Sequence, residues 1–500
     1  MTIGELLESN ARKFGGREAL LYQDRRYSFV DVDVEATRAA AALQSLGVEK
    51  GDKVAVMGQN TTAFVFACFG ALRIGAVIVP INHKLMPPET AYILEHSESK
   101  VWLFDGSLAD VARKVSTKAR VLCMDSDADG FERFEAVMAA GHPYRPQAVN
   151  SDDLGEILYT SGTTGKPKGC MHSQANVLLA AIASNLVFGL GQFDRTLIGM
   201  PIWHCFPLNN MLIGSYYVGA SVVLMREYHP VEFLKLIQAE RCTAFFGAPI
   251  AFIMPVQKVP VFDSFDLSSV RIWMYGGGPI DADTARMLMD RYKTTNFYQV
   301  FGMTETGPTG MALYPSEQVA KAGSIGRYAI SGCDMRVVKA DGGEAGPGEI
   351  GEIWFRCQSI MRGYYRDPVA TAEVFSDGWY KTGDLARLDE DGYLFIVDRA
   401  KDMIIVGGEN VYCKEVEDVL AAYPGVLECA VVGQKDKDWG ETVVAVVVAQ
   451  EPLDEASLKA HLGERLARYK VPRVFRFVDQ LPRTPTGKVM KYVIRDTLAG

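Results

Sequence analysis

The chain has 500 residues, more than one hydrophobic core usually organises, so we expect at least two domains. With 48% apolar and 23% charged residues it has the composition of a globular protein, which excludes a disordered chain. The formal charge of −9 argues against nucleic acid as a main partner, although a pocket can still be basic locally.

The cysteines and apolar runs suggest a cytoplasmic protein. The nine cysteines include no Cys-x-x-Cys pair, so neither a disulfide framework nor a zinc cluster is predicted. Charged residues near the N-terminus argue against a signal peptide. The most apolar window, residues 63–81, contains Arg73, Gly75 and Pro80, and this interruption predicts a helix, a turn and a buried strand rather than a membrane span.

The first 150 residues alternate helical and strand-like patterns. Apolar residues at helical spacing predict helices over 4–14 and 34–46, with Gly47 as the C-cap of the second. Runs rich in Val and Ile predict buried strands over 53–57 and 76–81. This alternation indicates parallel β-sheets layered with helices.

Residues 159–169 interrupt this pattern with the sequence Tyr-Thr-Ser-Gly-Thr-Thr-Gly-Lys-Pro-Lys-Gly. Its backbone N–H groups, hydroxyls and ammonium groups can wrap a polyphosphate. The loop is not a Walker A motif, because Pro167 follows Lys166 where that motif needs Ser or Thr. Composition alone supports an ordinary polar turn equally well.

The layered pattern continues after the loop and then changes. Strands are predicted over 196–200, 221–225 and 243–246, with a helix over 230–240. From about residue 323 to 397, short β-runs separated by glycine turns favour a small β-barrel or sandwich subdomain. The predicted strands of this subdomain are 335–339, 351–356 and 393–397.

The last hundred residues read as a separate α+β unit. Helices are predicted over 415–422 and 455–468, the second capped by Asp454. The predicted strands are 430–433, 442–449 and 474–478.

Four further motifs carry candidate chemistry. In Gln299 to Glu305, an aromatic ring, a glycine, a hydroxyl and a carboxylate could stack a base and hold a metal, although such a string is more often an ordinary strand end. Asp384 follows a glycine turn and could bind ribose hydroxyls, but turn aspartates are common. The charge run 398–402 would usually be a solvated face, and Lys488 would usually be a surface lysine.

The order of these five motifs, from residue 159 to 488, resembles the adenylate-forming enzymes: acyl-CoA synthetases, peptide-synthetase adenylation domains and beetle luciferases. The resemblance covers essentially the whole chain. The strings Gly-Met-Thr-Glu-Thr-Gly-Pro and His-Cys-Phe-Pro-Leu-Asn look most like 4-coumarate and other aryl or medium-chain acid CoA ligases.

The resemblance implies an α/β fold with a large N-terminal domain over 1–398, which includes the β-rich subdomain of about 323–397. A small mobile α+β domain over 399–500 would rotate about Lys401 as the hinge. The implied activity is an ATP-dependent carboxylic acid–CoA ligase that works through an acyl-adenylate. Its co-substrates and cofactors would be ATP, CoA and Mg²⁺.

The resemblance also implies a role for individual residues. The catalytic residues would be Lys488, Thr304, Glu305 and His204, and Mg²⁺ would be held by Glu305 and Thr164. The nucleotide and CoA contacts would be Thr160, Ser161, Gly162, Thr163, Thr164, Gly165, Lys168, Gly277, Gly278, Gln299, Phe301, Gly302, Asp384, Arg399, Gly407 and Gly408. The acyl pocket would be formed by Phe206, Asn210, Phe246, Gly276, Pro308 and Thr309.

Three positions depart from the family's usual pattern. Acetate-type enzymes tend to place Trp just before the Thr-Glu pair; this chain has Val300 and Phe301 there, so we expect an acid larger than acetate, of the aryl, cinnamate-like or medium-chain fatty class. Phe301 also replaces the usual Tyr and keeps the ring without its hydroxyl. Cys413 stands where many relatives have Pro, which leaves the rigidity of its loop open.

Two alternatives remain at this point. An adenylating enzyme that loads a carrier protein is one, although residues 201–212 contain no Asp to bind an amino acid's ammonium group. A non-catalytic nucleotide-binding homologue is the other, since fold alone does not secure activity. The expected partners are a small carboxylic acid, ATP and CoA, with no nucleic acid and no membrane span, and a homodimer stays open.

Overall fold

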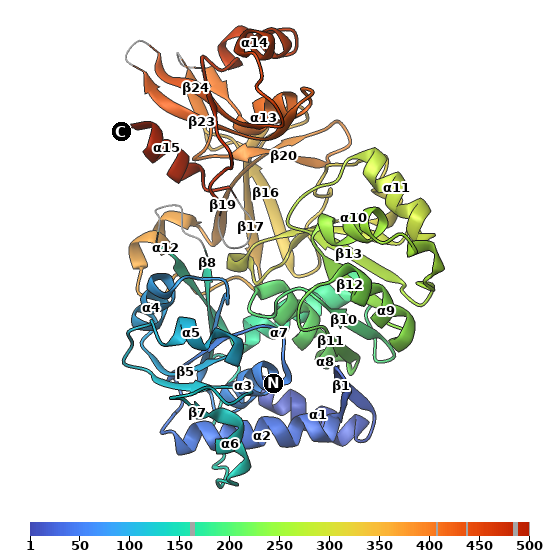
Figure 1. The fold of residues 1–500 in the computed structure, drawn as a ribbon, viewed down its shortest axis with the longest axis vertical. Coiled ribbons are helices and arrows are strands. Elements are labelled where there is room, and N and C mark those ends of the chain that lie inside the picture. The colour runs from blue at the N-terminus through green and yellow to red at the C-terminus, as the bar shows by residue number, and fades with distance from the viewer. Residues whose placement is uncertain (161–165, 407–408, 437–438, 484–488, 500) are drawn as a thin grey trace. The chain divides into compact units, whose positions relative to one another are not determined.

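The computed structural model describes residues 1–160, 166–406, 409–436, 439–483 and 489–499 (Figure 1). The chain divides into two compact units, each described by itself below. Unit 1 comprises Met1–Thr160, Pro167–Met335 and Phe355–Tyr380, and unit 2 contains Arg336–Trp354 and Lys381–Gly500. The boundary predicted at residues 398 and 399 stays a prediction.

Unit 1 contains an eight-stranded sheet in the order β15-β14-β13-β12-β10-β11-β1-β2. Neighbouring strands from β14 to β1 run parallel, whereas β15 and β2 pair antiparallel at the two edges. The bounds are β1 Glu18–Tyr22, β2 Arg25–Ser28, β10 Arg195–Ile198, β11 Ser221–Leu224, β12 Ala244–Gly247, β13 Ile272–Gly276, β14 Phe297–Gly302 and β15 Gly310–Leu313.

A second sheet in unit 1 has seven strands in the order β7-β6-β5-β3-β4-β8-β9. It is parallel except for the β8–β9 hairpin, which carries the glycine-rich loop between its strands. The bounds are β3 Lys53–Met57, β4 Val77–Ile81, β5 Ser99–Phe104, β6 Arg120–Cys123, β7 Glu132–Arg133, β8 Leu154–Thr160 and β9 Lys168–Ser173.

Alternating side chains of the two sheets build three apolar layers, because successive strand residues point to opposite faces. Val54 and Val222 enter a core shared by both sheets, Ala55 the outer core of the seven-stranded sheet, and Val223 that of the eight-stranded sheet. The inner core also takes helices α1 Ile3–Phe14, α2 Phe29–Ser45, α3 Thr62–Arg73, α7 Gln174–Phe188, α8 Gly214–Val218 and the π-helix η2 Phe206–Ile213.

The outer faces are covered by further helices (Figure 1). Helices α9, α10 and α11 lie on the eight-stranded sheet and α4 and α5 on the seven-stranded one. Their bounds are α4 Pro87–His96, α5 Ala109–Ala112, α9 Pro230–Glu240, α10 Pro249–Lys258 and α11 Ala282–Tyr292, and the remaining helices of unit 1 are α6 Phe134–Ala139 and α12 Pro368–Val374. Unit 1 is therefore a layered α/β body, as predicted.

A five-stranded sheet follows in the chain, with the order β16-β17-β19-β18 and β20 paired to β19. Its strands are β16 Cys333–Val338, β17 Ile350–Cys357, β18 Phe375–Ser376, β19 Trp379–Leu388 and β20 Leu394–Arg399. This is the β-rich subdomain that the glycine turns predicted.

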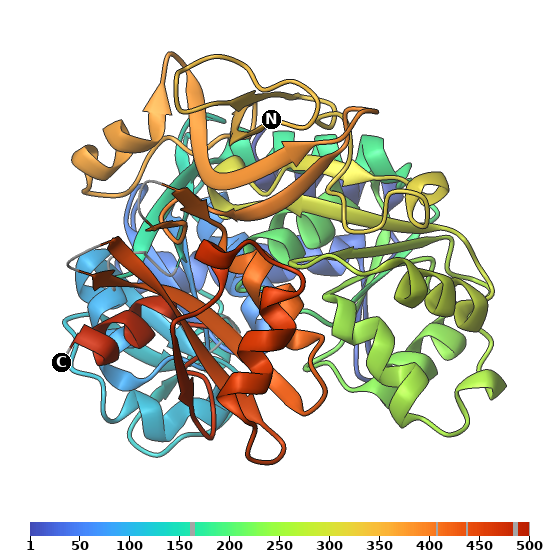
Figure 2. The same ribbon diagram turned by 90° about the horizontal axis from the view of Figure 1, so that it is seen from above.

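The C-terminal part of unit 2 is an α+β sandwich around a sheet ordered β22-β21-β24-β23, with β25 paired to β24. Helices α13 and α14 pack on one face and α15 on the other, as Figure 2 shows in orange and red. The bounds are β21 Ile404–Val406, β22 Glu409–Val411, α13 Cys413–Ala421, β23 Val426–Asp436, β24 Gly440–Ala449, α14 Glu455–Gly463, β25 Val474–Phe477 and α15 Lys491–Ala499.

The predicted elements are largely confirmed, with two corrections to helix ends. Helix α2 begins at Phe29 rather than at residue 34, because Ser28 and Asp31 form a capping box. Helix α14 is capped by Asp454 as predicted but ends at Gly463 rather than at residue 468. The apolar spacing continues into Leu466, which packs on the same core, yet glycine disfavours a longer helix.

Candidate active site

The β8–β9 hairpin brings the two ends of the glycine-rich loop together. Thr160 pairs with Lys168 across the hairpin, and Tyr159 pairs with Gly169. A Cβ atom at Gly169 would lie 2.6 Å from Ile157 Cγ2, so this position has room only for glycine unless the neighbour moves. The hairpin therefore holds Thr160 and Lys168 side by side at the base of the loop.

Tyr364 joins two of the predicted site residues. Its hydroxyl donates to Glu305 Oε1 at 3.0 Å, and Lys168 Nζ lies 5.0 Å from the centroid of its ring. Burial raises the pKa of the Tyr364 phenol, so the hydroxyl stays protonated and able to donate. Tyr364 thus places a cation and a carboxylate around one side chain, and the sequence analysis missed it.

Thr304 begins the short 3₁₀ helix η4, Thr304–Thr306, which Gly307 ends with a φ of 77°. Thr304 Oγ1 lies 3.3 Å from Cys205 Sγ, and that sulfur lies 3.7 Å from His204 Nδ1. Burial raises the pKa of Cys205 to about 12, so it remains a neutral thiol. The structure thereby brings the predicted catalytic residues Thr304 and His204 together around one thiol.

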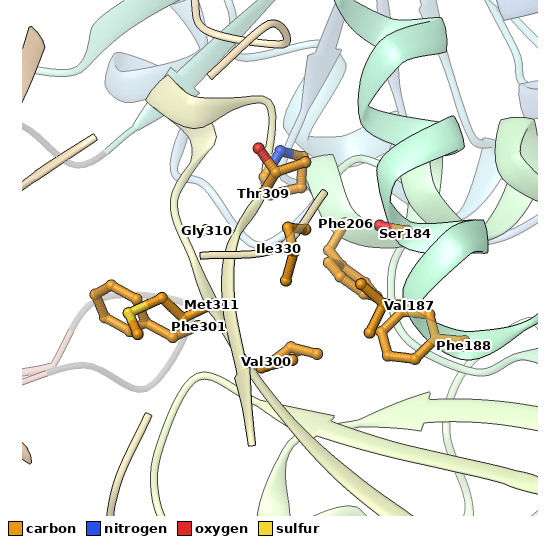
Figure 3. A pocket seen from close by; sticks show the side chains of 12 residues that line it. Ser184, Val187, Phe188, Phe206, Val300, Phe301, Thr309, Gly310, Met311 and Ile330 are labelled. Atoms are coloured by element: carbon orange, nitrogen blue, oxygen red, sulfur yellow. The ribbon is translucent and has the colours of Figure 1, made fainter. Parts of the chain in front are cut away.

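A small cavity of about 10 Å³ in unit 1 adjoins these residues (Figure 3). Apolar side chains dominate its lining, and Thr309 and Ser184 add hydroxyls. The full lining is Ser184, Val187, Phe188, Phe206, Val300, Phe301, Pro308, Thr309, Gly310, Met311, Ala312 and Ile330. The site thus offers an apolar body with a few hydroxyls, a composition typical of small-molecule pockets.

Three of the six predicted pocket residues, Phe206, Pro308 and Thr309, line this cavity. The other three lie behind it. The ring of Phe246 packs on Phe206 with centroids 4.1 Å apart, and a Cβ at Gly276 would meet both Val300 and Phe246. The Asn210 amide donates to the hydroxyl of Ser184.

Strand β14 separates the cavity from a second face. In Figure 3 the side chains of Phe301 and Met311 lie on the other side of the β14–β15 ribbon from Val300 and Phe206. This follows from strand alternation, since Val300 and Phe301 are neighbours. The aromatic ring predicted to stack on a base thus lies on the opposite face of β14 from Val300 and Phe206.

The predicted glycines around β14 differ in the space they have. Gly302 faces Gly310 across the β14–β15 hairpin, and a Cβ at Gly302 would lie 2.9 Å from the carbonyl oxygen of Thr309. Gly277 has a φ of 82°, and a Cβ at Gly277 or Gly278 would meet nothing within 4 Å. The predicted Gln299 is buried and accepts a hydrogen bond from Tyr275 Oη at 3.3 Å.

A buried carboxyl group lies under this site. Glu156 of β8 is 1% exposed and accepts a hydrogen bond from Asn209 Nδ2 at 2.6 Å. Burial raises the pKa of Glu156 to about 7. Because Asn209 belongs to the π-helix that carries Phe206, this contact connects the β8–β9 hairpin with the pocket wall.

Unit 2 holds the predicted ribose and hinge residues. Asp384 and Arg399 are paired across β19 and β20, and Arg399 Nε lies 2.5 Å from Asp384 Oδ1. Lys401 is exposed in the turn that follows. The N–H of Cys413 donates to the carboxylate of Asp398, and its thiol donates to the carbonyl oxygen of Asp402 at 2.9 Å. Cys413, which replaces the usual Pro, therefore fixes its loop through two donors that Pro lacks.

Eight predicted residues lie outside the described part of the chain: Ser161, Gly162, Thr163, Thr164, Gly165, Gly407, Gly408 and Lys488. Their predicted roles stay predictions.

Glu305 is the described candidate for a metal ligand. Among the residues that the structure describes, no three His, Cys, Asp or Glu side chains gather into a metal site. A single carboxylate such as Glu305 still fits Mg²⁺, which is usually held by one or two carboxylates together with substrate phosphates.

Among the described residues, no helix is long and apolar enough to cross a bilayer.

Comparison with known protein families gives two matches along the chain. Residues 7–365 match the AMP-binding enzyme family, and residues 415–488 match the AMP-binding enzyme C-terminal domain.

Individual proteins match over nearly the full length. A feruloyl-CoA synthase from Amycolatopsis sp. is 36% identical over 94% of this chain and 93% of its own, and the long-chain-fatty-acid–CoA ligase FadD13 of Mycobacterium tuberculosis is 35% identical over 95% and 93%. The o-succinylbenzoate CoA synthetase of Bacillus subtilis, solved with its acyl-adenylate intermediate, is 30% identical over 99% and 98%, with a TM-score of 0.88. The same synthetase has also been solved with ATP and a magnesium ion, with a TM-score of 0.87.

Proposed function

The chain belongs to the AMP-binding enzyme family and is an ATP-dependent acid–CoA ligase that acts through an acyl-adenylate, and on that premise we propose that its acid is larger than acetate. The proposed class is aryl, cinnamate-like or medium-chain fatty acids. We further propose a cytoplasmic enzyme with Mg²⁺ and CoA as cofactor and co-substrate.

The cavity lining carries this proposal. The side chains of Phe206, Val300 and Ile330 give the cavity an apolar wall, which would contact the hydrocarbon part of an acid. No tryptophan precedes the Thr304–Glu305 pair, so no indole fills the pocket from that side. The relatives named above act on feruloyl, long-chain fatty and succinylbenzoyl groups, which are all larger than acetyl.

The first half-reaction needs positioned cations and donors more than an acid or base. The substrate carboxylate attacks the α-phosphorus of ATP, pyrophosphate leaves, and charge builds on the phosphate oxygens. We assign Lys168, Thr304 and Lys488 to the support of that charge, with Tyr364 positioning Lys168 and Glu305. Mg²⁺ bound at Glu305 would neutralise phosphate charge.

In the second half-reaction the CoA thiolate attacks the carbonyl carbon of the acyl-adenylate, and AMP leaves. His204 lies beside Cys205 and Thr304, where it can control access to the carboxylate. We propose that Asp384 binds the ribose and that Arg399, its ion-pair partner, turns to the nucleotide.

Pyrophosphate release tests the proposal. ATP and Mg²⁺ are supplied with acetate, medium-chain and long-chain acids, benzoates or cinnamates, each with and without CoA. We expect CoA-dependent turnover with one of the larger classes and a kcat/KM for acetate at least about a hundredfold lower. Preference for acetate would overturn the pocket argument. Pyrophosphate release that stalls at the adenylate with CoA would favour a carrier protein as acceptor, and ATP binding without any release would favour a non-catalytic homologue.

A further inference from the structure

Two cysteines face each other on neighbouring strands beside the candidate pocket. Cys333 begins β16 and Cys357 ends β17, and these strands are adjacent in the five-stranded sheet. One residue outward, the N–H of Gln358 donates to the carbonyl oxygen of Gly332 at 2.9 Å. One residue inward, Arg356 Nη2 lies 2.8 Å from Asp334 Oδ2. These contacts bracket the cysteines and place them directly across from each other on antiparallel strands.

The type of cross-strand pair favours a disulfide. In an antiparallel ladder, pairs joined by backbone hydrogen bonds alternate with pairs that are not joined. Because Gly332 and Gln358 are joined, Cys333 and Cys357 form a pair of the second kind, in which the Cα atoms are about 4.5 Å apart. Disulfides span Cα separations of about 4.4 to 6.8 Å. The backbone therefore does not need to move for a bond between the two sulfur atoms.

The two thiols are unequal, which gives each a role. All nine cysteines are free, and Cys333 and Cys429 are the two that are only half-buried. A hydrogen bond from the Cys357 thiol lowers the pKa of Cys333, whereas burial raises that of Cys429 to about 12. The hydrogen bond to Cys333, followed by burial, raises the pKa of Cys357. Cys333 is thus the accessible attacking thiol and Cys357 the buried resolving one.

We propose that Cys333 and Cys357 form a dithiol–disulfide site that reacts reversibly with small-molecule disulfides of the glutathione type. The Cys333 thiolate attacks one sulfur of the oxidised disulfide and releases one thiol, which leaves a mixed disulfide on Cys333. Cys357 gives its proton to solvent and attacks the Cys333 sulfur, and the second small thiol leaves. The oxidant gains two electrons and two protons as the two protein thiols become one disulfide.

The site is coupled to the candidate pocket through Thr309. Cys333 Sγ donates to Thr309 Oγ1 at 3.1 Å, and Thr309 donates to the carbonyl oxygen of Thr306 at 2.9 Å. Thr309 is 1% exposed and lines the cavity. A disulfide removes the Cys333 proton and with it this hydrogen bond, which leaves a buried hydroxyl oxygen with one donor fewer. The effect on the acid substrate rests on the function proposed above, whereas the disulfide itself does not.

Intact mass measurement of the full-length protein tests the disulfide without relying on activity. The protein is incubated with oxidised glutathione, quenched with N-ethylmaleimide and mapped by peptide mass spectrometry. We expect the loss of two hydrogens and a cross-linked peptide pair containing Cys333 and Cys357, both reversed by dithiothreitol. A stable glutathione adduct on Cys333 with Cys357 alkylated, or no change at either residue, would overturn the proposal.

Serine variants assign the roles. Cys357→Ser should stop at a glutathione adduct on Cys333, and Cys333→Ser should leave Cys357 unmodified. Cys429→Ser is the matched control, since it removes the other half-buried thiol and should form the disulfide as the wild type does. Thermal unfolding of each variant checks the fold, and the wild-type mass map decides the proposal if a serine variant does not fold.

Kinetics test the coupling separately. In the oxidised protein we expect the KM for the acid to rise several-fold with kcat little changed, and dithiothreitol to restore it. An unchanged KM in a fully cross-linked protein would overturn the coupling through Thr309. If no acid is turned over, the proposed function fails while the mass measurement still decides the disulfide.

Discussion

The buried carboxyl group of Glu156 accepts a hydrogen bond from the neutral Asn209 amide, and its strand neighbour supplies no positive charge. Its strand partner His172 is fully buried, and burial lowers the pKa of that imidazole to about 4, so it is neutral at pH 7. Asn209 Oδ1 is buried and has no hydrogen-bond partner among the described residues. A protonated Glu156 has an O–H group that can donate to that oxygen, whereas the carboxylate does not.

The sign of the pH dependence follows from the raised pKa. The carboxyl group titrates at about 4.5 when unfolded and at about 7 in the folded chain, so between these values the folded state binds more protons. Stability therefore falls as pH rises from about 4.5 to 7, and above 7 the full penalty remains. At about 1.4 kcal/mol per pH unit the penalty is on the order of 3 kcal/mol.

Glu156→Gln should remove this penalty. Its amide keeps the oxygen that accepts from Asn209 and adds N–H groups that can donate to Asn209 Oδ1. We expect the variant to unfold at a higher temperature than the wild type at pH 8, with the difference shrinking towards pH 5, as measured by scanning calorimetry. Glu95→Gln, at an exposed position of α4, is the control and should follow the wild type. Parallel curves for Glu156→Gln and the wild type would show that Glu156 is ionised without cost.

At the site, the sequence predicted the motif residues but not the distant side chains that contact them. Thr304 and Glu305 were predicted from their motif, but Tyr364, which donates to Glu305, lies 59 residues away in a segment without a motif. Glu156 stands inside a strand pattern that predicts only burial, and its partner Asn209 comes from a distant helix. Contacts between side chains far apart in the sequence depend on tertiary packing, which local pattern does not contain.

At the scale of elements, hydrogen bonds of Cys413 hold the connection from β20 to α13, and this cysteine stands where many relatives have Pro. Asp398 ends the buried part of β20, and its carboxylate accepts from the backbone N–H groups of Arg399 and Cys413. The Cys413 thiol adds the bond to Asp402. The first residue of α13 is thereby tied to both ends of the predicted hinge turn at Lys401.

Cys413→Pro should destabilise this connection even though proline is normally accepted in the first turn of a helix. It removes both donors and leaves the buried Asp398 carboxylate short of one partner, at a cost of about 1–3 kcal/mol. We expect a lower unfolding temperature for the C-terminal part of the chain and faster hydrogen exchange in α13. Cys413→Ser keeps an N–H and a hydroxyl donor and should stay close to the wild type. An unchanged unfolding temperature in the proline variant would mean that these hydrogen bonds add nothing to stability.

The elements themselves were largely readable from sequence. The strand over 53–57 and the helix over 230–240 have the predicted ends, because apolar periodicity and the flanking residues agree there. The strand order of the eight-stranded sheet, with β1 between β11 and β2, was not predictable. Strand order is set by which buried faces pack together, and these β-runs are too alike for their sequences to choose partners.

At the scale of the whole molecule, the residues that we propose for the two half-reactions belong to different units of the chain. Thr304, Glu305 and the cavity belong to unit 1, whereas Asp384, Arg399 and the segment leading to Lys488 belong to unit 2. The described flanks of that segment are anchored: Arg483 bridges to Val489, and Lys491 Nζ lies 2.8 Å from Glu417 Oε1. We propose that Lys488 serves one half-reaction and is withdrawn for the other, as the family resemblance implies.

Lys488→Ala separates the two halves. Without the ammonium group, the negative charge that builds at the α-phosphate loses a cation, so we expect pyrophosphate release to fall by at least about a hundredfold. Thioester formation from a preformed acyl-adenylate and CoA should stay within a few-fold of the wild type, because the family resemblance implies that Lys488 is withdrawn before the thiolate attacks. Lys459→Ala, which removes a partly exposed lysine of α14, should leave both rates unchanged. Equal losses in both half-reactions would mean that Lys488 shapes the fold or binds the adenylate generally, and the adenylation role would then have to be assigned to another cation.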